Sequence, residues 1–244
     1  MPTYNSKMYV SQAIESVISQ SFIDWELIIV DDGSTDSTLE FLEMRYSNEK
    51  RIKLIPLSEN SGAAVARNVA IEIANGRFIA FLDSDDLWSP NKLSIQLNTF
   101  KDTNAYLVFS KYHVIRGEEP RILRTIPAPS RIVYNDLLFG DPIGCLTAIY
   151  DTEKTGKVYM PEIKMRQDWG LWMRILRFGN SYGYGIQKPL ATLRLHSRSL
   201  TANKLEAMYY NYILLRTEGG LKPAKAMSGT LMHAISALSR RLVM

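Results

Sequence analysis

The sequence has almost no cysteine and no long apolar run. Its one cysteine, Cys145, excludes an internal disulfide and is typical of a reducing compartment. No stretch reaches the roughly 18 apolar residues that a membrane-spanning helix needs, and the N-terminus has no signal-peptide pattern. Zinc-type clusters of cysteine and histidine, internal repeats and low-complexity tracts are missing as well. We therefore expect a cytoplasmic protein without a disulfide framework or a membrane span.

The 244 residues have the composition of an ordinary globular protein, with 46% hydrophobic and 22% charged residues. This length suits one large α/β domain, with or without a small appendage. The net charge of +4 is a mild excess that favours an anionic membrane surface or an anionic substrate. It is too small to indicate nucleic acid as a partner.

Helices and strands alternate over the first hundred residues. Apolar and β-branched residues predict strands over residues 25–30, 52–57 and 78–82, and helical spacing predicts helices over 6–20, 37–46, 63–74 and 90–101. This alternation indicates parallel strands joined by right-handed crossovers. The loops at residues 2–5, 31–32, 60–62 and 83–86 then meet at the carboxyl edge of one sheet, where a nucleotide cleft is expected.

The pattern changes after residue 101. Strands are expected over residues 106–115 and 121–126, as a pair, and over 144–150 and 190–195, with helices over 131–139 and 169–178. The sequence pattern of the tail, residues 202–244, predicts two helices separated by Gly219, Gly220 and Pro223.

Three carboxylates, Asp83, Asp85 and Asp86, follow the strand expected over residues 78–82. On an extended backbone residues two apart point the same way, so we expect Asp83 and Asp85 to share one face and one cation. Oxygen ligands suit Mg²⁺ or Mn²⁺, which keep positions open for phosphate oxygens. The alternative is that Asp85 and Asp86 cap the helix that starts near Pro90.

Six short motifs occur in order over about residues 1–200. They are PTYN at 2–5, VDDGSTD at 30–36, NSGAAVARN at 60–68, FLDSDD at 81–86, QDWGLWMR at 167–174 and LRLHSRS at 193–199. Together they resemble the family 2 inverting glycosyltransferases of the GT-A fold. The chain looks most like the non-processive bacterial enzymes that build O-antigen, capsule or teichuronic-type polysaccharides, because it lacks the QxxRW signature of the processive synthases.

The resemblance implies a fold and a reaction. The fold is α/β, the GT-A (nucleotide-diphospho-sugar transferase) type, with a Rossmann-like mixed sheet flanked by helices and a C-terminal helical tail. Residues 1–101 would bind the nucleotide sugar, residues 102–201 would bind the acceptor within the same domain, and residues 202–244 would form the tail. The reaction is transfer of one sugar from a UDP- or dTDP-sugar to a growing, lipid-linked surface glycan such as O-antigen or capsule.

The resemblance assigns the metal site to residues far apart in sequence. Asp85 is the metal ligand for Mn²⁺ or Mg²⁺, and Asp83 contacts the ribose or the ion. His196 is a third metal ligand or a contact of the diphosphate, with a structural role as the equal alternative. Asp86 is expected to cap the following helix.

Four further residues are assigned to the donor by resemblance. Asp32 accepts a hydrogen bond from a pyrimidine ring N–H, Tyr4 stacks on the base, and the Pro2 backbone bonds the edge of the base. Arg67 approaches the pyrophosphate or the base. The alternatives are a turn role for Asp32 beside Gly33, core packing for Tyr4 and an ion pair with the acids for Arg67.

Asp168 is the expected general base. In an inverting single displacement, one carboxylate deprotonates the acceptor hydroxyl while the sugar is attacked from its opposite face. Asp168 directly precedes the helix expected over residues 169–178, so an N-cap role is the alternative and is compatible with the first. We expect Trp169 to form an acceptor wall and Trp172 to pack in the core.

Two departures from the family pattern support a rival interpretation. No apolar strand precedes PTYN, and Gln167 stands where an acid commonly precedes the base. Both are compatible with a non-catalytic nucleotide-sugar-binding or scaffold protein of the same fold. A nucleotidyltransferase is a second rival, but it needs a glycine-rich basic phosphate loop that PTYN does not supply.

The tail contains an apolar stripe flanked by cations, including Lys222 and Lys225. Such a stripe can lie on a membrane, here the cytoplasmic face of the inner membrane, where a lipid-linked acceptor would be found. Packing on the core, or on a second copy in a homodimer, is slightly favoured.

Overall fold

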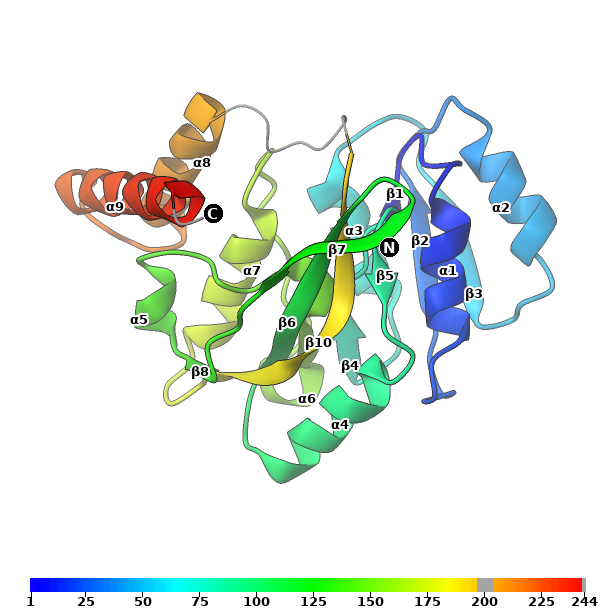
Figure 1. Ribbon diagram of the computed structural model, residues 1–244, viewed down its shortest axis with the longest axis horizontal. Coiled ribbons are helices and arrows are strands. Elements are labelled where there is room, and N and C mark those ends of the chain that lie inside the picture. Colours follow the sequence, from blue (N-terminus) through cyan, green and yellow to red (C-terminus); the bar gives the residue numbers. More distant parts are fainter. Residues whose placement is uncertain (197–203, 243–244) are drawn as a thin grey trace.

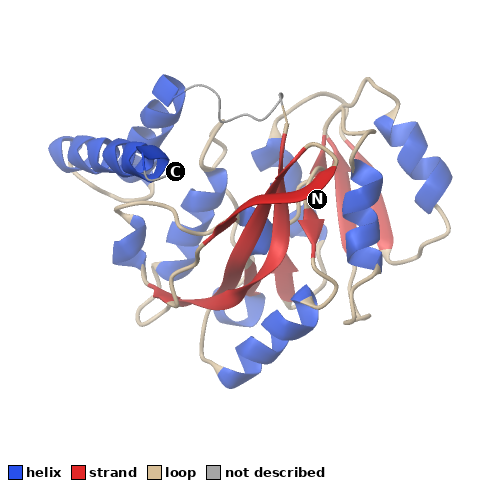
Figure 2. Cartoon of the chain, viewed as in Figure 1, coloured by secondary structure: helices blue, strands red, loops and turns tan. Residues whose placement is uncertain are grey.

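The computed structural model describes residues 1–196 and 204–242, which form a central layer of strands with helices around it (Figures 1 and 2). Of the last sequence motif, Ser197, Arg198 and Ser199 therefore lie outside the described residues. The strands form two sheets, one of three strands and one of seven.

The first sheet is parallel, as the alternating pattern predicted. Its strands are β1 (Pro2–Thr3), β2 (Leu27–Asp31) and β3 (Ile52–Pro56), in that order. Helices α1 (Val10–Ile18), α2 (Thr38–Tyr46) and α3 (Ala63–Ile73) alternate with them. Every residue of β2 is buried, because helices cover both faces of this strand.

The second sheet is mixed and has the order β4-β9-β6-β10-β5, with β7 paired to β6 and β8 to β10. Its strands are β4 (Phe78–Ala80), β5 (Leu87–Trp88), β6 (Leu107–Arg116), β7 (Glu119–Ile126), β8 (Arg131–Ile132), β9 (Ile149–Asp151) and β10 (Gly183–Leu195). The connecting helices are α4 (Lys92–Asp102), α5 (Tyr134–Leu137), the 3₁₀ helix η1 (Cys145–Thr147), α6 (Thr152–Thr155) and α7 (Gln167–Leu176).

The position of β4 corrects the prediction that the strand over residues 78–82 belongs to the same parallel sheet as the strands over residues 25–30 and 52–57. Phe78, Ile79 and Ala80 pair antiparallel with β9 instead. β4 is therefore the outermost strand of the second sheet, and β1, with two residues, is outermost in the first. Within the described residues, β4 and β1 each pair with a strand on one side only.

Two shorter predictions were also wrong in part. The helix expected over residues 131–139 divides into the strand β8 and the single-turn helix α5. The strand expected over residues 144–150 begins instead with the 3₁₀ turn η1, because the N–H of Thr147 donates to the carbonyl of Gly144 at 2.9 Å.

The tail packs on the core of the second sheet. Helix α8 (Lys204–Thr217) and helix α9 (Pro223–Leu242) are separated by the predicted Gly219-Gly220 break. Leu214 and Leu215 of α8 are fully buried and join the core that contains Trp169 and Trp172 of α7. Among the described helices, none is both long and apolar enough to span a membrane.

Candidate active site

The three acids after β4 lie on a turn and not on an extended strand. The N–H of Asp86 donates to the carbonyl of Asp83 at 3.2 Å, and Ser84 Oγ donates to Ser6 Oγ at 2.9 Å. The argument that alternation along a strand aligns Asp83 and Asp85 was therefore wrong. The two carboxylates still interact, since the charge of Asp83 contributes to raising the pKa of Asp85.

Asp85 contacts His196, which lies 111 positions later in the sequence. The Oδ2 of Asp85 lies 2.6 Å from Nε2 of His196, at the end of β10. The ring of Tyr9 stacks on His196 with centroids 5.7 Å apart. Burial and the nearby Asp83 raise the pKa of Asp85, against the opposing effect of His196. A cation bound at this position would therefore stabilise the ionised carboxylates.

Asp86 does not cap helix α4, which corrects that expectation. Its Oδ1 accepts the backbone N–H of Arg194 at 2.9 Å, while Asn91 takes the N-cap position of α4. The Arg194 side chain returns to the same turn, since its Nε donates to the carbonyl of Asp85 at 2.9 Å. Arg194 and Asp86 together join β10 to the acidic turn and hold Asp85 beside His196.

Arg67 links the acidic turn to the other half of the site. It is 8% exposed, near the start of α3, and its Nη2 forms an ion pair with Oδ1 of Asp83. Burial opposes its charge, but Asp83 and the more distant Asp168 stabilise it, so the pKa of Arg67 is raised. The ion pair expected as an alternative role for Arg67 is thus present.

Asp168 lies in the first turn of α7. The helix begins one residue earlier than Asp168, at Gln167, and Arg166 occupies the N-cap position with φ +69°. The N-cap role considered for Asp168 was therefore wrong. The Oδ1 of Asp168 accepts the N–H of Trp169 at 2.9 Å. Burial raises the pKa of Asp168, partly offset by the positive charges of Arg67 and Arg166. A raised pKa makes this carboxylate a stronger base.

Sequence reasoning assigned no role to four residues in this region of the structure. Arg166 Nε donates to Oδ1 of Asn211 on α8 at 2.8 Å, and Nδ2 of Asn211 lies 3.2 Å from Nδ1 of His233 on α9. Burial, and then the charge of Asp168, raise the pKa of Asp141 well above its usual range. The two hydrogen bonds join residues that are 45 and 22 positions apart, so no local sequence pattern predicts them.

Trp169 is a core residue, which corrects its assignment as an acceptor wall. It is fully buried, and its Nε1 donates to the carbonyl of Leu137 at 2.9 Å. Its ring stacks on His233 of the tail with centroids 5.4 Å apart. The neighbouring Trp172 is fully buried too, as expected.

The residues expected to bind the base lie at the carboxyl ends of β1 and β2. Asp32 accepts the N–H of Ser61 at 2.7 Å and of Gly62 at 2.8 Å, one on each oxygen, which leaves a lone pair on each. Tyr4 is 47% exposed, so it is not packed in the core. The carbonyls on either side of Pro2 accept from β2, so the Pro2 carbonyl points away from β2.

Gly33 permits the close approach of these loops. It adopts φ +72°, and a Cβ there would lie 2.9 Å from the backbone nitrogen of Asn60. The second and third strand-end loops are therefore in contact, and the N–H of Asn5 donates to Ser34 Oγ at 2.9 Å, which joins the first loop to the second, as predicted.

The carboxylate and imidazole groups at the acidic turn fit a hard divalent cation that also binds phosphate. Among the described residues no group of three or more His, Cys, Asp or Glu side chains converges as a complete metal cage. A hard cation that binds substrate phosphates needs only one or two carboxylates from the protein, and substrate oxygens and water complete its coordination shell. Asp85 and Asp83, with His196 against Asp85, supply that partial set.

The sequence matches a known family over most of this framework. The description of the matching family is glycosyl transferase family 2, and the match covers residues 1–160, which include the acidic turn and Arg67. The chain belongs to glycosyl transferase family 2. It is a glycosyltransferase with the GT-A fold, as the motifs predicted. Asp168 and the tail lie beyond the matched residues, so their arrangement is known from the structure alone.

Full-length relatives and solved structures agree with this family. The chain is 39% identical over 241 residues to the putative teichuronic acid biosynthesis glycosyltransferase TuaG of Bacillus subtilis, covering 99% of this chain and 95% of that protein. It is 36% identical over 208 residues to the Escherichia coli UDP-Glc:alpha-D-GlcNAc-diphosphoundecaprenol beta-1,3-glucosyltransferase WfgD, covering 85% and 80%. S. aureus TarS 1-349 in complex with UDP-GlcNAc has the same fold, with a TM-score of 0.71, 24% identity and 94% and 70% coverage.

Proposed function

We propose that this family 2 enzyme transfers one sugar, with inversion, from a UDP- or dTDP-sugar to a lipid-linked glycan during assembly of a bacterial surface polysaccharide. The observation that carries the proposal is the position of Arg67. This buried guanidinium contacts Asp83 on the acidic turn and is stabilised by Asp168. The acid assigned to the donor and the acid assigned to the acceptor therefore both interact with one buried cation.

The donor would bind at the ends of β1 and β2. Asp32 has a free lone pair on each carboxylate oxygen for a pyrimidine ring N–H, and the exposed Tyr4 ring can stack on the base. Asp85, with Asp83 and His196, would hold Mn²⁺ or Mg²⁺ against the diphosphate. When bound, that ion supplies charge neutralisation for the leaving group.

The acceptor would react beside Asp168. Its carboxylate accepts the proton of the acceptor hydroxyl while the acceptor oxygen bonds to the anomeric carbon. The bond from that carbon to the diphosphate oxygen breaks, and its electron pair leaves with the nucleoside diphosphate. Attack on the face opposite the leaving group inverts the anomeric configuration. Arg166, held by Asn211 of the tail, lies beside the base.

The acceptor named for the Escherichia coli relative makes a lipid diphosphate the first choice here. The transfer assay therefore uses polyprenyl-diphosphate-linked GlcNAc with a panel of UDP- and dTDP-sugars, Mn²⁺, Mg²⁺ or EDTA. We expect one donor to be consumed in a metal-dependent reaction that gives an inverted linkage by NMR. Donor binding without turnover would instead support the non-catalytic alternative, and release of pyrophosphate from a nucleoside triphosphate would support the nucleotidyltransferase.

The tail presents a surface that suits a membrane-bound acceptor. We define the tail face as the exposed apolar residues Leu205, Tyr209, Met227, Leu231 and Met232. Lys222 and Lys225 are exposed beside it. Apolar side chains flanked by cations favour an anionic membrane surface, here the cytoplasmic leaflet of the inner membrane.

Replacing Met227 and Leu231 with glutamine is expected to reduce flotation with anionic vesicles at least about threefold, because apolar burial and charge both drive such binding. Transfer to a water-soluble acceptor should be unchanged. The matched control replaces Ile23 and Met44, which are exposed on the opposite half of the chain. Equal flotation of all three proteins, or a concentration-dependent dimer lost only in the tail variant, would favour the homodimer instead.

A further inference from the structure

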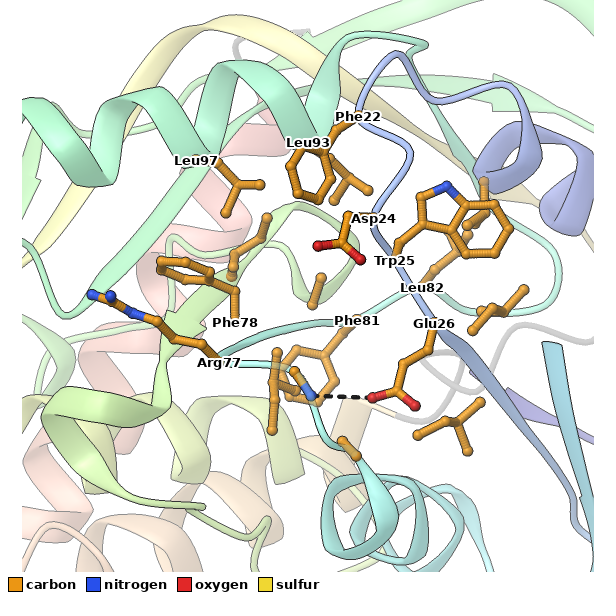
Figure 3. Close-up of a pocket in the computed structure, with 18 of the residues that line it drawn as sticks. Phe22, Asp24, Trp25, Glu26, Arg77, Phe78, Phe81, Leu82, Leu93 and Leu97 are labelled. Atoms are coloured by element: carbon orange, nitrogen blue, oxygen red, sulfur yellow. Dashed lines mark hydrogen bonds between the residues drawn. The ribbon is translucent and has the colours of Figure 1, made fainter. Parts of the chain in front are cut away.

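A cavity of about 860 Å³ lies between β2 and β4 (Figure 3). Its lining includes Trp25, Phe78 and Leu93, whereas the described residues Asp85 and Asp168 are not part of it. The cavity is therefore separate from the acids that the proposed reaction uses. The groups around Asp168, and not this cavity, indicate where an acceptor binds.

Tyr112 of β6 lies beside the reaction centre. Its ring packs against Gly144, where a Cβ would lie 2.7 Å from Cε1 of Tyr112. The next residue, Cys145, is half-buried at the start of η1; burial raises the pKa of its thiol, and Asp168 contributes to the increase. Burial and then the charge of Asp141 raise the pKa of Tyr112 to about 12, with a smaller contribution from Asp168. The phenol is therefore a neutral hydrogen-bonding group close to the base.

The strand register places Arg124 of β7 next to Tyr112. The antiparallel hairpin of β6 and β7 pairs Tyr112 with Ile126 and Val114 with Arg124 (Figure 1). Opposed residues of such a pair point to the same face, as do residues two apart on one strand. Arg124 is therefore the diagonal neighbour of Tyr112 on this face. In agreement, the charge of Arg124 opposes the increase in the pKa of Tyr112.

A second arginine, Arg116, belongs to the same face, because it follows Tyr112 and Val114 at intervals of two along β6. An acid, Glu119, stands opposite Arg116 in the register, whereas the buried Val114 stands opposite Arg124. Arg124 is also exposed. Of the two, Arg124 is therefore the better placed to bind an external anion.

Apolar side chains are exposed beside Arg124. Ile122 is 50% exposed and Leu123 is 46% exposed, at the two positions directly before it. Among the described strands, β7 pairs with β6 alone, so these residues lie on an outer strand of the sheet. A guanidinium next to two exposed apolar side chains suits a ligand that is anionic at one end and hydrocarbon at the other.

The order of these groups matches the order of the parts of a lipid-linked sugar. Outward from Asp168 come the phenol of Tyr112, then Arg124, and then Ile122 and Leu123. Such an acceptor has its reacting hydroxyl on the sugar, then a diphosphate, and then an isoprenoid chain. A phenol can hydrogen-bond a sugar hydroxyl, and the planar guanidinium of arginine binds phosphate oxygens through two N–H groups at once.

We propose that Arg124 binds the diphosphate of the acceptor, with Tyr112 on the acceptor sugar and with Ile122 and Leu123 on the first isoprenoid units. This assignment rests on the proposed function, because it takes Asp168 as the base and a lipid-linked sugar as the acceptor. It makes the β6–β7 hairpin the part of the enzyme that selects a lipid-linked acceptor over a soluble glycan, which has no diphosphate.

The test compares two acceptors that carry the same sugar. One is α-GlcNAc linked to farnesyl diphosphate, and the other is octyl α-GlcNAc, which has no diphosphate. Arg124→Gln is expected to raise KM for the first acceptor at least about 10-fold and to leave KM for the second unchanged, because only the first loses a charge-assisted contact. An equal effect on both acceptors would overturn the proposal, since Arg124 would then only support the site.

The matched control is Arg131→Gln. Arg131 is exposed on β8, and it pairs with Tyr184 at the opposite end of β10 from His196. It removes the same charge away from the hairpin, so KM for both acceptors should equal that of the native chain. An increase as large as that of Arg124→Gln would show a general effect of net charge and overturn the assignment.

A binding measurement separates this assignment from the proposed function. Calorimetric titration with farnesyl diphosphate, with UDP and Mg²⁺ already bound, needs no turnover. The native chain should bind farnesyl diphosphate at least about 10-fold more tightly than Arg124→Gln does. If the native chain transfers sugar to neither acceptor, the proposed function fails, and this titration still decides the role of Arg124. Equal affinity of the two proteins for farnesyl diphosphate, or weaker binding of UDP by Arg124→Gln, would overturn the proposal.

A double variant, Ile122→Gln with Leu123→Gln, tests the contact with the isoprenoid. It should bind farnesyl diphosphate at least about threefold more weakly than the native chain, because apolar surface is no longer buried. Inorganic diphosphate, which has no hydrocarbon, should bind both proteins equally. Undiminished affinity of the double variant for farnesyl diphosphate would refute the isoprenoid contact.

Discussion

Replacing Asp168 with asparagine is expected to lower kcat for sugar transfer by about 10³-fold, with the donor Kd unchanged. Asparagine keeps the shape and can accept the N–H of Trp169, but it cannot take a proton from the acceptor hydroxyl. Steady-state kinetics and calorimetric titration of the nucleotide sugar measure the two quantities. The neighbouring Gln167→Ala is the control, because the Gln167 side chain donates to the backbone carbonyl of Lys164.

The pH profile separates a base from a structural residue. Burial raises the pKa of Asp168, and only the ionised form acts as a base, so transfer should rise with pH through that pKa. A carboxyl whose folded pKa is raised stabilises the fold below its unfolded pKa, and this stability is lost as pH rises through the folded value. At neutral pH, Asp168→Asn should therefore have an equal or higher Tm than the native chain. Near-native turnover, or a lower Tm with the same pH profile, would refute the assignment.

Asp85→Ala is expected to remove metal-dependent transfer, with a loss of at least about 10²-fold in kcat/KM. The variant loses the carboxylate that contacts His196 and leaves Asp83 paired with Arg67. Mn²⁺ binding in the presence of UDP, followed by electron paramagnetic resonance, should weaken in parallel. This readout does not depend on turnover, so it distinguishes a metal ligand from a residue that only supports the fold.

The control for charge is Glu40→Ala, an exposed acid in the first turn of α2. It removes one negative charge without touching the acidic turn, so Mn²⁺ binding and kcat/KM should match the native chain. Full activity of the native chain in EDTA, or undiminished Mn²⁺ binding by Asp85→Ala, would contradict the metal role.

The order of helices and strands could be predicted because it depends on local patterns. The apolar run of β2 and the helical spacing of α3 are visible in short windows of sequence. The convergence of the loops followed from the parallel first sheet, and the contacts of Asp32 with Ser61 and Gly62 confirm it.

Long-range pairing accounts for most of what the sequence did not reveal. β4 was expected in one sheet with β2 and β3 because it has the same apolar, β-branched pattern, yet its antiparallel partner, β9, lies some 70 residues later. Asp86 looked like a helix cap because helix α4 follows it, but it accepts from Arg194, 108 positions away. Such choices are decided by tertiary packing, for which a single sequence has no periodic signal.

The link between α7 and the tail constrains how this protein can be altered. Arg174 on α7 forms hydrogen bonds to both carboxylate oxygens of Glu218, at 2.9 and 2.6 Å, and Arg166 bonds Asn211. The helix that carries Asp168 is thus fastened to the tail at both of its ends. Grafting a foreign tail to redirect acceptor choice would shift the proton-accepting group as well, unless the graft brings α7 with it.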